Sequence, residues 1–139
     1  MIFFNNKEKN AVKDLELVKI AALLIHAAKI DENYSSKEEE IIKQALLEIG
    51  VNKEDLNSTI NKGKEIEANS IQILEFTKEV KNLSEKNKIK IIESLWRIIY
   101  SNKDADIYET SLMRRLAGLL YIDSKIMGNI KDKVRKEIL

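Results

Sequence analysis

The chain has 139 residues, of which 44% are hydrophobic and 34% charged, so the sequence predicts one globular domain rather than a disordered chain. Its 24 basic and 23 acidic residues leave a net charge of +1, which gives no electrostatic basis for binding nucleic acid. The absence of cysteine excludes disulfides and thiolate chemistry, and the single histidine, His26, excludes a multi-histidine zinc site.

The expected location follows from the absence of a long apolar segment. No run of about 18 apolar residues occurs, so we expect no transmembrane segment. Met1-Ile2-Phe3-Phe4 is too short for the apolar core of a signal peptide, and residues 1–9 are expected to form a tail. The cytoplasm is the expected location, and this is compatible with association at a membrane surface.

The first predicted helix runs from about Asn10 to Lys29, where a wide apolar stripe has helical spacing. This stripe is expected to face the core and includes Ala11, Val12, Leu15, Val18, Ala22 and Ile25. His26 lies on this helix and is expected to be partly buried with a hydrogen-bond partner. A polar turn follows at 31–35. Ser35 and Glu38 then have the spacing of a capping box, which predicts the start of a second helix.

The middle of the chain contains two glycines and a short linking segment. Gly50 is expected to end the second helix as a C′ glycine, and Asn52 to cap a third helix. Gly63 and the charged residues after it indicate a weak end to that third helix. A linking helix is expected at about 70–82.

The last part of the chain predicts three more helices. Ser84 is expected to cap a long helix that ends at Tyr100, with Trp96 as a core anchor. After a second polar turn, Asp106 and Glu109 have capping-box spacing. Asp123 is expected to cap the last helix, whose apolar core stripe is formed by Ile126, Met127, Ile130 and Val134. Because proline is absent, long uninterrupted helices are favoured throughout.

The chain also contains an internal repeat with an offset of 71 positions, without a gap. The first turn matches the second, with Asp31 on Asn102 and Glu38 on Glu109. Apolar positions on both sides match as well, for example Leu24 on Leu95. The fold prediction is therefore all-α: a single compact bundle of about seven helices over 10–139, with an internal two-fold repeat. The halves are about 15–62 and 86–133, and the linking helix lies outside them.

The acidic turns are the candidate functional site. Calcium takes six to eight oxygen ligands, and each turn offers several oxygens. Asp31 follows the end of one helix and Glu38 lies in the first turn of the next, so a cation between them would join two helices. A capping role for Ser35 and Glu38, and for Asp106 and Glu109, explains the same residues without a metal. The spacing is not that of an EF-hand.

Several segments, in this order and spacing, resemble the TerB-like (tellurite resistance protein B-like) domain family. They are Leu74-Glu75-Phe76-Thr77, Leu95-Trp96-Arg97-Ile98-Ile99-Tyr100, Asp106-Ile107-Tyr108-Glu109 and Leu112-Met113-Arg114-Arg115-Leu116-Ala117-Gly118-Leu119-Leu120. The resemblance covers the chain from about residue 10. It implies an all-helical domain with two-fold repetition, an association with tellurite and other stress responses, and a divalent metal, calcium in particular, at acidic residues near the turns.

The family's usual turn is Asp-Gly, with a glutamate seven positions after the aspartate. This pattern marks Asp31 with Glu38, and position 102 with Glu109. The chain departs from it in both turns, because Glu32 and Lys103 replace the glycines and Asn102 replaces the second aspartate. Asn102 still offers a neutral oxygen. In the second turn, Asp104 and Asp106 are the residues that could substitute as ligands.

The function expected from the sequence is that of a non-enzymatic, stress-response (tellurite-resistance-like) helical module. It would bind a divalent cation, Ca²⁺ or Mg²⁺, at the acidic turns and engage protein partners. The alternative is a purely structural or interaction adaptor whose metal sites have decayed. An enzyme is not expected, since no nucleophile–base pair is visible in the sequence.

Overall fold

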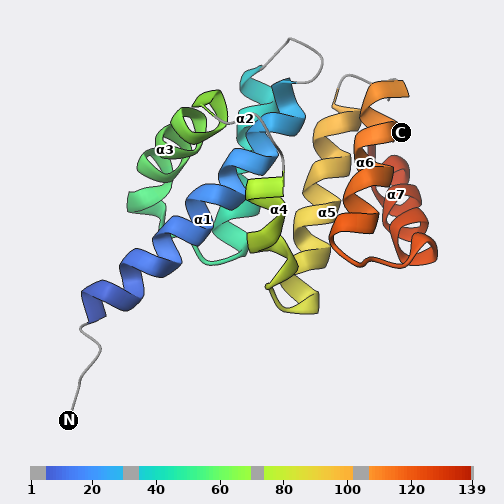
Figure 1. Cartoon of the computed structure of the whole chain (residues 1–139). Coiled ribbons are helices and arrows are strands. Elements are labelled where there is room, and N and C mark those ends of the chain that lie inside the picture. Colours follow the sequence, from blue (N-terminus) through green and yellow to red (C-terminus); the bar gives the residue numbers. More distant parts are fainter. Residues whose placement is uncertain (1–5, 30–34, 70–73, 102–106, 139) are drawn as a thin grey trace.

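The computed structural model describes residues 6–29, 35–69, 74–101 and 107–138; the side chains of 6–14, 74, 107–110 and 138 are not described. These ranges contain seven α-helices, one short 3₁₀ helix and no strand, which confirms the all-α prediction for the described residues (Figure 1). In chain order the elements are α1 (Asn6–Lys29), α2 (Ser36–Glu48), η1 (Lys53–Asp55), α3 (Leu56–Asn69), α4 (Leu74–Lys81), α5 (Glu85–Tyr100), α6 (Ile107–Leu119) and α7 (Ser124–Ile138).

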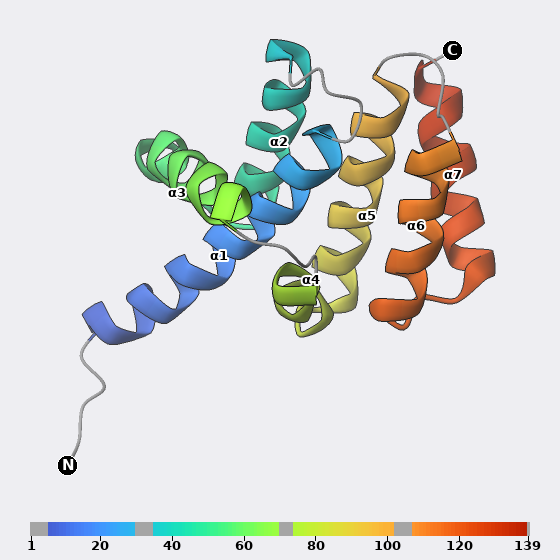
Figure 2. The same cartoon turned by 45° about the horizontal axis from the view of Figure 1, so that its top comes forward.

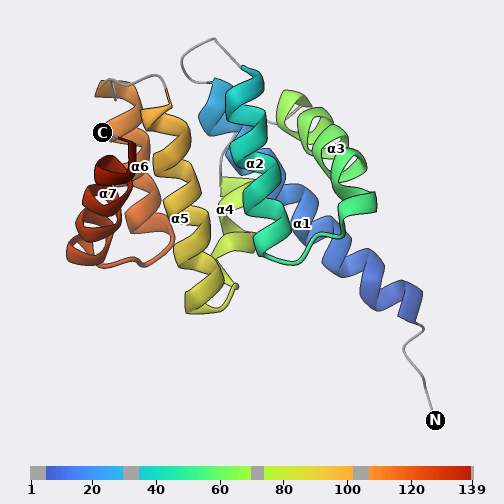
Figure 3. The same cartoon turned by 180° about the vertical axis from the view of Figure 1, so that it is seen from behind.

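Helix α1 lies at the centre of the first half of the fold. From Ile20 to Ile25, every residue is 1% exposed or less, so this part of α1 is buried on all sides. It packs against α2, α3, α4 and α5, while its first turns extend beyond the other helices (Figure 2). From the opposite side, α2 is seen between α3 and α5 (Figure 3). A helix that is apolar all round needs neighbours on every side, and these four helices supply them.

The helix ends confirm most of the predicted caps. Ser84 Oγ accepts a hydrogen bond from the backbone N–H of Asn87 at 3.2 Å, and α5 begins at the next residue. Asp123 Oδ1 accepts from the N–H of Lys125 at 2.8 Å before α7. Asn52 precedes the 3₁₀ helix η1 rather than α3, and its side chain makes no capping hydrogen bond.

Helices α2 and α6 end in the same way. In α2, Gly50 has φ +113° and the N–H of Val51 donates to the carbonyl of Leu46 at 3.0 Å, the pattern of a Schellman motif. In α6, the N–H of Ile122 donates to the carbonyl of Ala117 at 2.9 Å, and Tyr121 takes the glycine's place with φ 55°. Gly50 and Tyr121 are related by the repeat offset.

The helix bounds themselves follow the same offset. The starts of α2 and η1 correspond in this way to the starts of α6 and α7, respectively, and the end of α1 corresponds to the end of α5. The tight pairing of α1 with α3 has a counterpart in the pairing of α5 with α7. These bounds agree with an internal repeat; the superposition of the two halves, with Glu38 on Glu109, stays a prediction.

Three expectations about the elements differ from the structure. Helix α1 begins at Asn6 rather than Asn10, because the lysines and glutamate that follow favour helix and no glycine or proline interrupts them. Leu15 and Ile126, expected in core stripes, are 50% and 44% exposed. The linking helix is the shorter α4, and residues 70–73 of its expected range lie outside the described residues.

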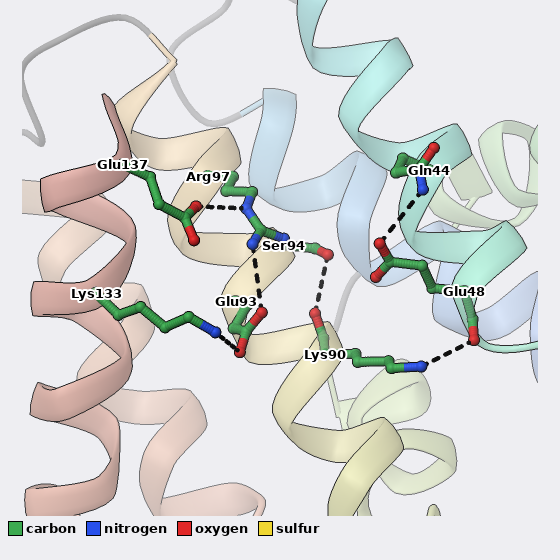
Figure 4. A network of polar contacts seen from close by, with 8 residues as sticks. All are labelled: Gln44, Glu48, Lys90, Glu93, Ser94, Arg97, Lys133 and Glu137. Carbon is green, nitrogen blue, oxygen red and sulfur yellow. Dashed lines mark hydrogen bonds and ion pairs between the residues drawn. The ribbon is translucent and has the colours of Figure 1, made fainter. Parts of the chain in front are cut away.

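Polar contacts of α5 reach helices of both halves (Figure 4). On one side, Glu93 pairs with Lys133 of α7 at 3.0 Å, and Arg97 pairs with Glu93 and with Glu137 of α7, each at 3.3 Å. On the other side, Lys90 Nζ donates to the backbone carbonyl of Glu48 at the end of α2, at 3.3 Å. Helix α5 is therefore bonded to a helix of each half.

Helices α1 and α3 approach closely at Gly63. A Cβ added there would lie 3.0 Å from Ala21 Cβ and 3.2 Å from the backbone nitrogen of Ala22. Gly63 is buried in the middle of α3, so the expected weak helix end is wrong. The residue 71 positions further along the chain is Val134, which is fully buried in α7.

We expect Gly63→Ala to lower the free energy of unfolding by about 1–2 kcal/mol. Overpacking costs about 1–3 kcal/mol, and the better helix propensity of alanine offsets about 1 kcal/mol of that. Gly128→Ala in α7 is the matched control, since its Cβ would have no neighbour within 4 Å, and it should be neutral or stabilising. Denaturant unfolding of both variants measures the difference. Equal stability of the two variants would contradict the close α1–α3 contact.

Candidate functional site

The helices that flank the two acidic turns meet at one end of the molecule. Helices α1 and α5 end there, and α2 and α6 begin there (Figure 1). Lys37, in the first turn of α2, donates from Nζ to the backbone carbonyl of Ser101, directly after α5, at 3.3 Å. We call this end, defined by Lys29, 35–38, 100–101 and the start of α6, the turn edge.

The predicted site residues are only partly described. Ser35 and Glu38 are described in full, and Glu109 lies in the first turn of α6 with an undescribed side chain. The remaining predicted residues, Asp31, Asn102, Asp104 and Asp106, lie outside the described residues, as do Glu32 and Lys103. Helix α6 begins directly after Asp106, just as α2 begins directly after Ser35.

Ser35 and Glu38 form the predicted capping box. The backbone N–H of Glu38 donates to Ser35 Oγ at 3.2 Å, and the N–H of Ser35 donates to Glu38 Oε1 at 3.3 Å. The Ser35 hydroxyl also donates to Oε1, at 3.0 Å. The capping interpretation is therefore confirmed for the first turn, and Oε1 of the carboxylate has a fixed position.

Glu38 is buried although it lies at a helix start. Its exposed fraction is 1%, whereas Glu40 on the same helix has a side chain that is 75% exposed. Burial of a carboxylate is unfavourable unless hydrogen bonds and opposite charge compensate. The two bonds from Ser35 and the positive end of the α2 dipole do so here. A ligand at the turn edge would thus meet a carboxylate that is already held in place.

A third helix also contributes to the turn edge. Glu67 of α3 has a side chain that is 9% exposed, and it accepts from Lys29 Nζ at 2.7 Å and contacts His26 Nδ1 at 3.2 Å. His26 is therefore partly buried with a polar partner, as predicted. The sequence did not point to Glu67, because these contacts join residues far apart in the chain and Glu67 belongs to a run of charges.

Tyr100 closes α5 beside the turn edge. Its ring stacks on Trp96 with centroids 5.8 Å apart. Burial raises the pKa of the Tyr100 phenol above its ordinary value, with Asp132 acting in the same direction and Arg135 against it. The phenol is therefore neutral near pH 7 and brings no negative charge to the second turn.

The donors at the turn edge have the chemistry of a site for a hard cation. Carboxylate and carbonyl oxygens are what Ca²⁺ and Mg²⁺ prefer. Among the side chains that the structure describes, however, no three histidine, cysteine, aspartate or glutamate residues gather into a metal-ligand group. Glu38 is the only described carboxylate of the predicted set, so the fit is partial.

The capping bonds can be tested without any metal. Ser35→Ala should lower the free energy of unfolding by about 0.5–2 kcal/mol, because the first N–H groups of α2 lose their acceptor. Asp106→Ala, directly before α6, is predicted to cost a similar amount. Glu38→Gln should cost less than about 1 kcal/mol, because glutamine also serves in a capping box. Denaturant unfolding in a chelator measures all three; a neutral Ser35→Ala would contradict the capping role.

Comparison with known proteins gives one family. None of the described helices has the length and apolarity to span a membrane. The chain has no significant match among curated proteins or among solved structures. The family model described as "Tellurite resistance protein TerB" matches residues 17–132, which includes the helices on both sides of each acidic turn. The chain therefore belongs to the TerB family.

Proposed function

We propose that this protein is a non-enzymatic helical module of the tellurite-resistance type that holds a divalent cation at the turn edge and engages a protein partner. The observation that carries the cation proposal is Glu38, a buried carboxylate fixed by Ser35 at the edge where both acidic turns begin and end. Membership of the TerB family supports the stress-response setting.

The helix ends favour a cation at this edge. Helices α1 and α5 end there, and the last carbonyls of a helix carry the negative end of its dipole. In the first turn, Asp31 and Glu38 would hold the ion. In the second turn, the oxygens would come from Asn102, Asp104, Asp106 and Glu109. Calcium or magnesium is the expected ion because all of these donors are oxygens.

The second candidate function is an adaptor whose metal sites have decayed. It is favoured by the capping box, which already uses Oε1 of Glu38, and by Lys37, whose ammonium group bonds to Ser101 at the turn edge. Lys103 and Asn102 in the second turn also favour the adaptor function. In this case, the acidic residues start helices and do nothing more.

A catalytic role is not proposed. The chain has no cysteine, and its single histidine, His26, contacts Glu67. That pairing belongs to the packing of α1 on α3. We propose a cytoplasmic location, which a cation-dependent binding module of this kind would suit.

A Ca²⁺ titration of three proteins tests the cation proposal. Glu38→Gln keeps the capping acceptor but removes the charge, so it should weaken Ca²⁺ binding by about tenfold or more. Glu40→Gln, on the same helix but with a 75% exposed side chain, is the matched control and should bind like the unaltered protein. Asp31→Asn should weaken binding as Glu38→Gln does. Calorimetric titration at one ionic strength measures the dissociation constants.

Two results would contradict this proposal. If the unaltered protein binds neither Ca²⁺ nor Mg²⁺ at millimolar concentration, the adaptor function stands. If Glu38→Gln and Glu40→Gln weaken binding equally, the ion is held by surface charge in general and not at the turn edge.

The altered second turn gives a separate prediction. Asn102→Asp with Lys103→Gly adds a carboxylate and removes a nearby positive charge. In general, two like charges about 6 Å apart repel by roughly 0.7–3 kcal/mol for each unit of metal charge. The double substitution should therefore strengthen Ca²⁺ binding by about tenfold or more. An unchanged dissociation constant would show that the second turn is not a degraded metal site.

A further inference from the structure

A surface hollow lies between α5, α6 and α7, in the second half of the fold. Its volume is about 210 Å³. We call it the α6–α7 hollow, and it is lined by Trp96, Met113, Arg114, Ala117, Ser124, Met127, Gly128 and Lys131. None of these residues belongs to the turn edge.

The floor of the hollow is apolar and polarisable. Trp96, Met113 and Met127 are 3%, 1% and 6% exposed. The Trp96 indole N–H donates to the Met127 sulfur at 3.3 Å, so the one polar group of the floor has a partner, although a thioether is a weak acceptor. Methionine side chains adapt readily to different apolar partners, which suits a surface that receives a side chain from another molecule.

The rim of the hollow is positively charged. Arg114 is exposed, and Lys131 Nζ lies 5.4 Å from the centre of the Trp96 ring. The described residues that line the hollow include two cations and no carboxylate. Neither Arg114 nor Lys131 forms an ion pair with another described residue. The charge around the hollow is therefore complementary to an acidic partner.

Small residues keep the hollow open. Gly128 lies inside α7, where glycine costs about 0.5–1 kcal/mol relative to alanine, yet a Cβ there would meet nothing within 4 Å. Packing and backbone conformation therefore do not require this glycine. At the first-repeat positions equivalent to Ala117 and Lys131, the chain has Leu46 and Ile60, which are 0% and 2% exposed. At these two positions the first half therefore has a large buried apolar side chain, where the second half has a small or a charged residue.

We infer that the α6–α7 hollow binds one large apolar side chain of an acidic protein segment. The apolar side chain would lie on Trp96 and the two methionines, and carboxylates on both sides of it would pair with Arg114 and Lys131. This inference names the partner chemistry of the proposed function, on whose partner role it rests. It uses a surface distinct from the turn edge and does not require the cation.

A designed peptide tests the inference. The probe has a single phenylalanine flanked by glutamates, and two control peptides replace the phenylalanine with alanine or the glutamates with glutamines. Trp96 is the only tryptophan of the chain, so its fluorescence reports directly on the floor of the hollow. We expect the fluorescence to change and to saturate as the probe is added. Each control peptide should bind more weakly than the probe by about tenfold or more.

Two pairs of variants locate the binding. Gly128→Leu fills the hollow and should weaken binding by about tenfold or more, whereas Gly118→Leu, on α6 outside the hollow and also in open space, should change it by less than about twofold. Lys131→Glu should weaken binding of the acidic peptide, whereas Lys125→Glu, the same change on α7 outside the hollow, should not. Circular dichroism confirms that each variant is folded.

The titration is run in a chelator and again in Ca²⁺. Binding in both conditions is expected, because the hollow lies apart from the turn edge. Absence of binding at millimolar peptide would overturn the inference, and so would equal binding by Gly128→Leu and the unaltered protein. Equal binding of the glutamine peptide would overturn the acidic character of the partner. If the Ca²⁺ titration shows no binding, the cation proposal is contradicted but the peptide-binding inference is not.

Discussion

The burial of α1 on every side is the constraint on which the first half of the structure depends. Because Ile20 to Ile25 are inaccessible, α2, α3, α4 and α5 must each present an apolar surface to the same helix. The contact of Gly63 with Ala21 then fixes how near α3 can approach. With α1 held in this way, its last turn is held too, and Lys29 and His26 meet Glu67 at the turn edge. The proposed cation site thus begins from helix ends that packing has already positioned.

Several helix bounds of the two halves correspond through the offset of 71 positions, but the buried side chains of the halves differ. A Schellman motif ends α2 and α6 alike, with Gly50 in one and Tyr121 in the other. Where the first half has Leu46, the second has Ala117; where the first has Gly63, the second has Val134. Gly63 lies where α3 approaches α1 closely, and Ala117 lines the hollow beside α6 and α7. The hydrogen bond from Lys90 of α5 to the backbone carbonyl of Glu48 at the end of α2 connects the two halves. The molecule therefore has two separate surfaces of interest: the polar turn edge, and the apolar α6–α7 hollow with its positively charged rim.

The sequence predicted the features that depend on local chemistry. Helix caps and terminating glycines act on backbone groups only a few positions away, so the spacing of the residues is sufficient to predict them. The residues predicted in this way are Ser35, Ser84, Asp123 and Gly50. Contacts between distant segments were not predictable in this way. Glu67 meets His26 and Lys29 only after α3 packs on α1, and Gly63 is required by a neighbour that the sequence does not reveal. The sequence did not predict the hollow, because neither Gly128 nor Ala117 is unusual when it is considered alone. Among the predicted metal ligands, only Glu38 has a described side chain. Its predicted role in helix capping is confirmed, and its role as a metal ligand stays a prediction.

Native-state hydrogen exchange, with and without Ca²⁺, tests most directly whether the turn edge is the functional centre. The amides of Glu38 and Glu39 bond to Ser35 at the start of α2. The amide of Val51 lies after the end of α2 and that of Lys125 in the first turn of α7, both at the opposite end of the bundle (Figure 1). A cation held at the turn edge should slow exchange at Glu38 and Glu39 by about tenfold or more at saturation and leave Val51 and Lys125 nearly unchanged. Equal slowing at both ends, or no slowing at Glu38 and Glu39 in Ca²⁺, would contradict a cation site at this edge.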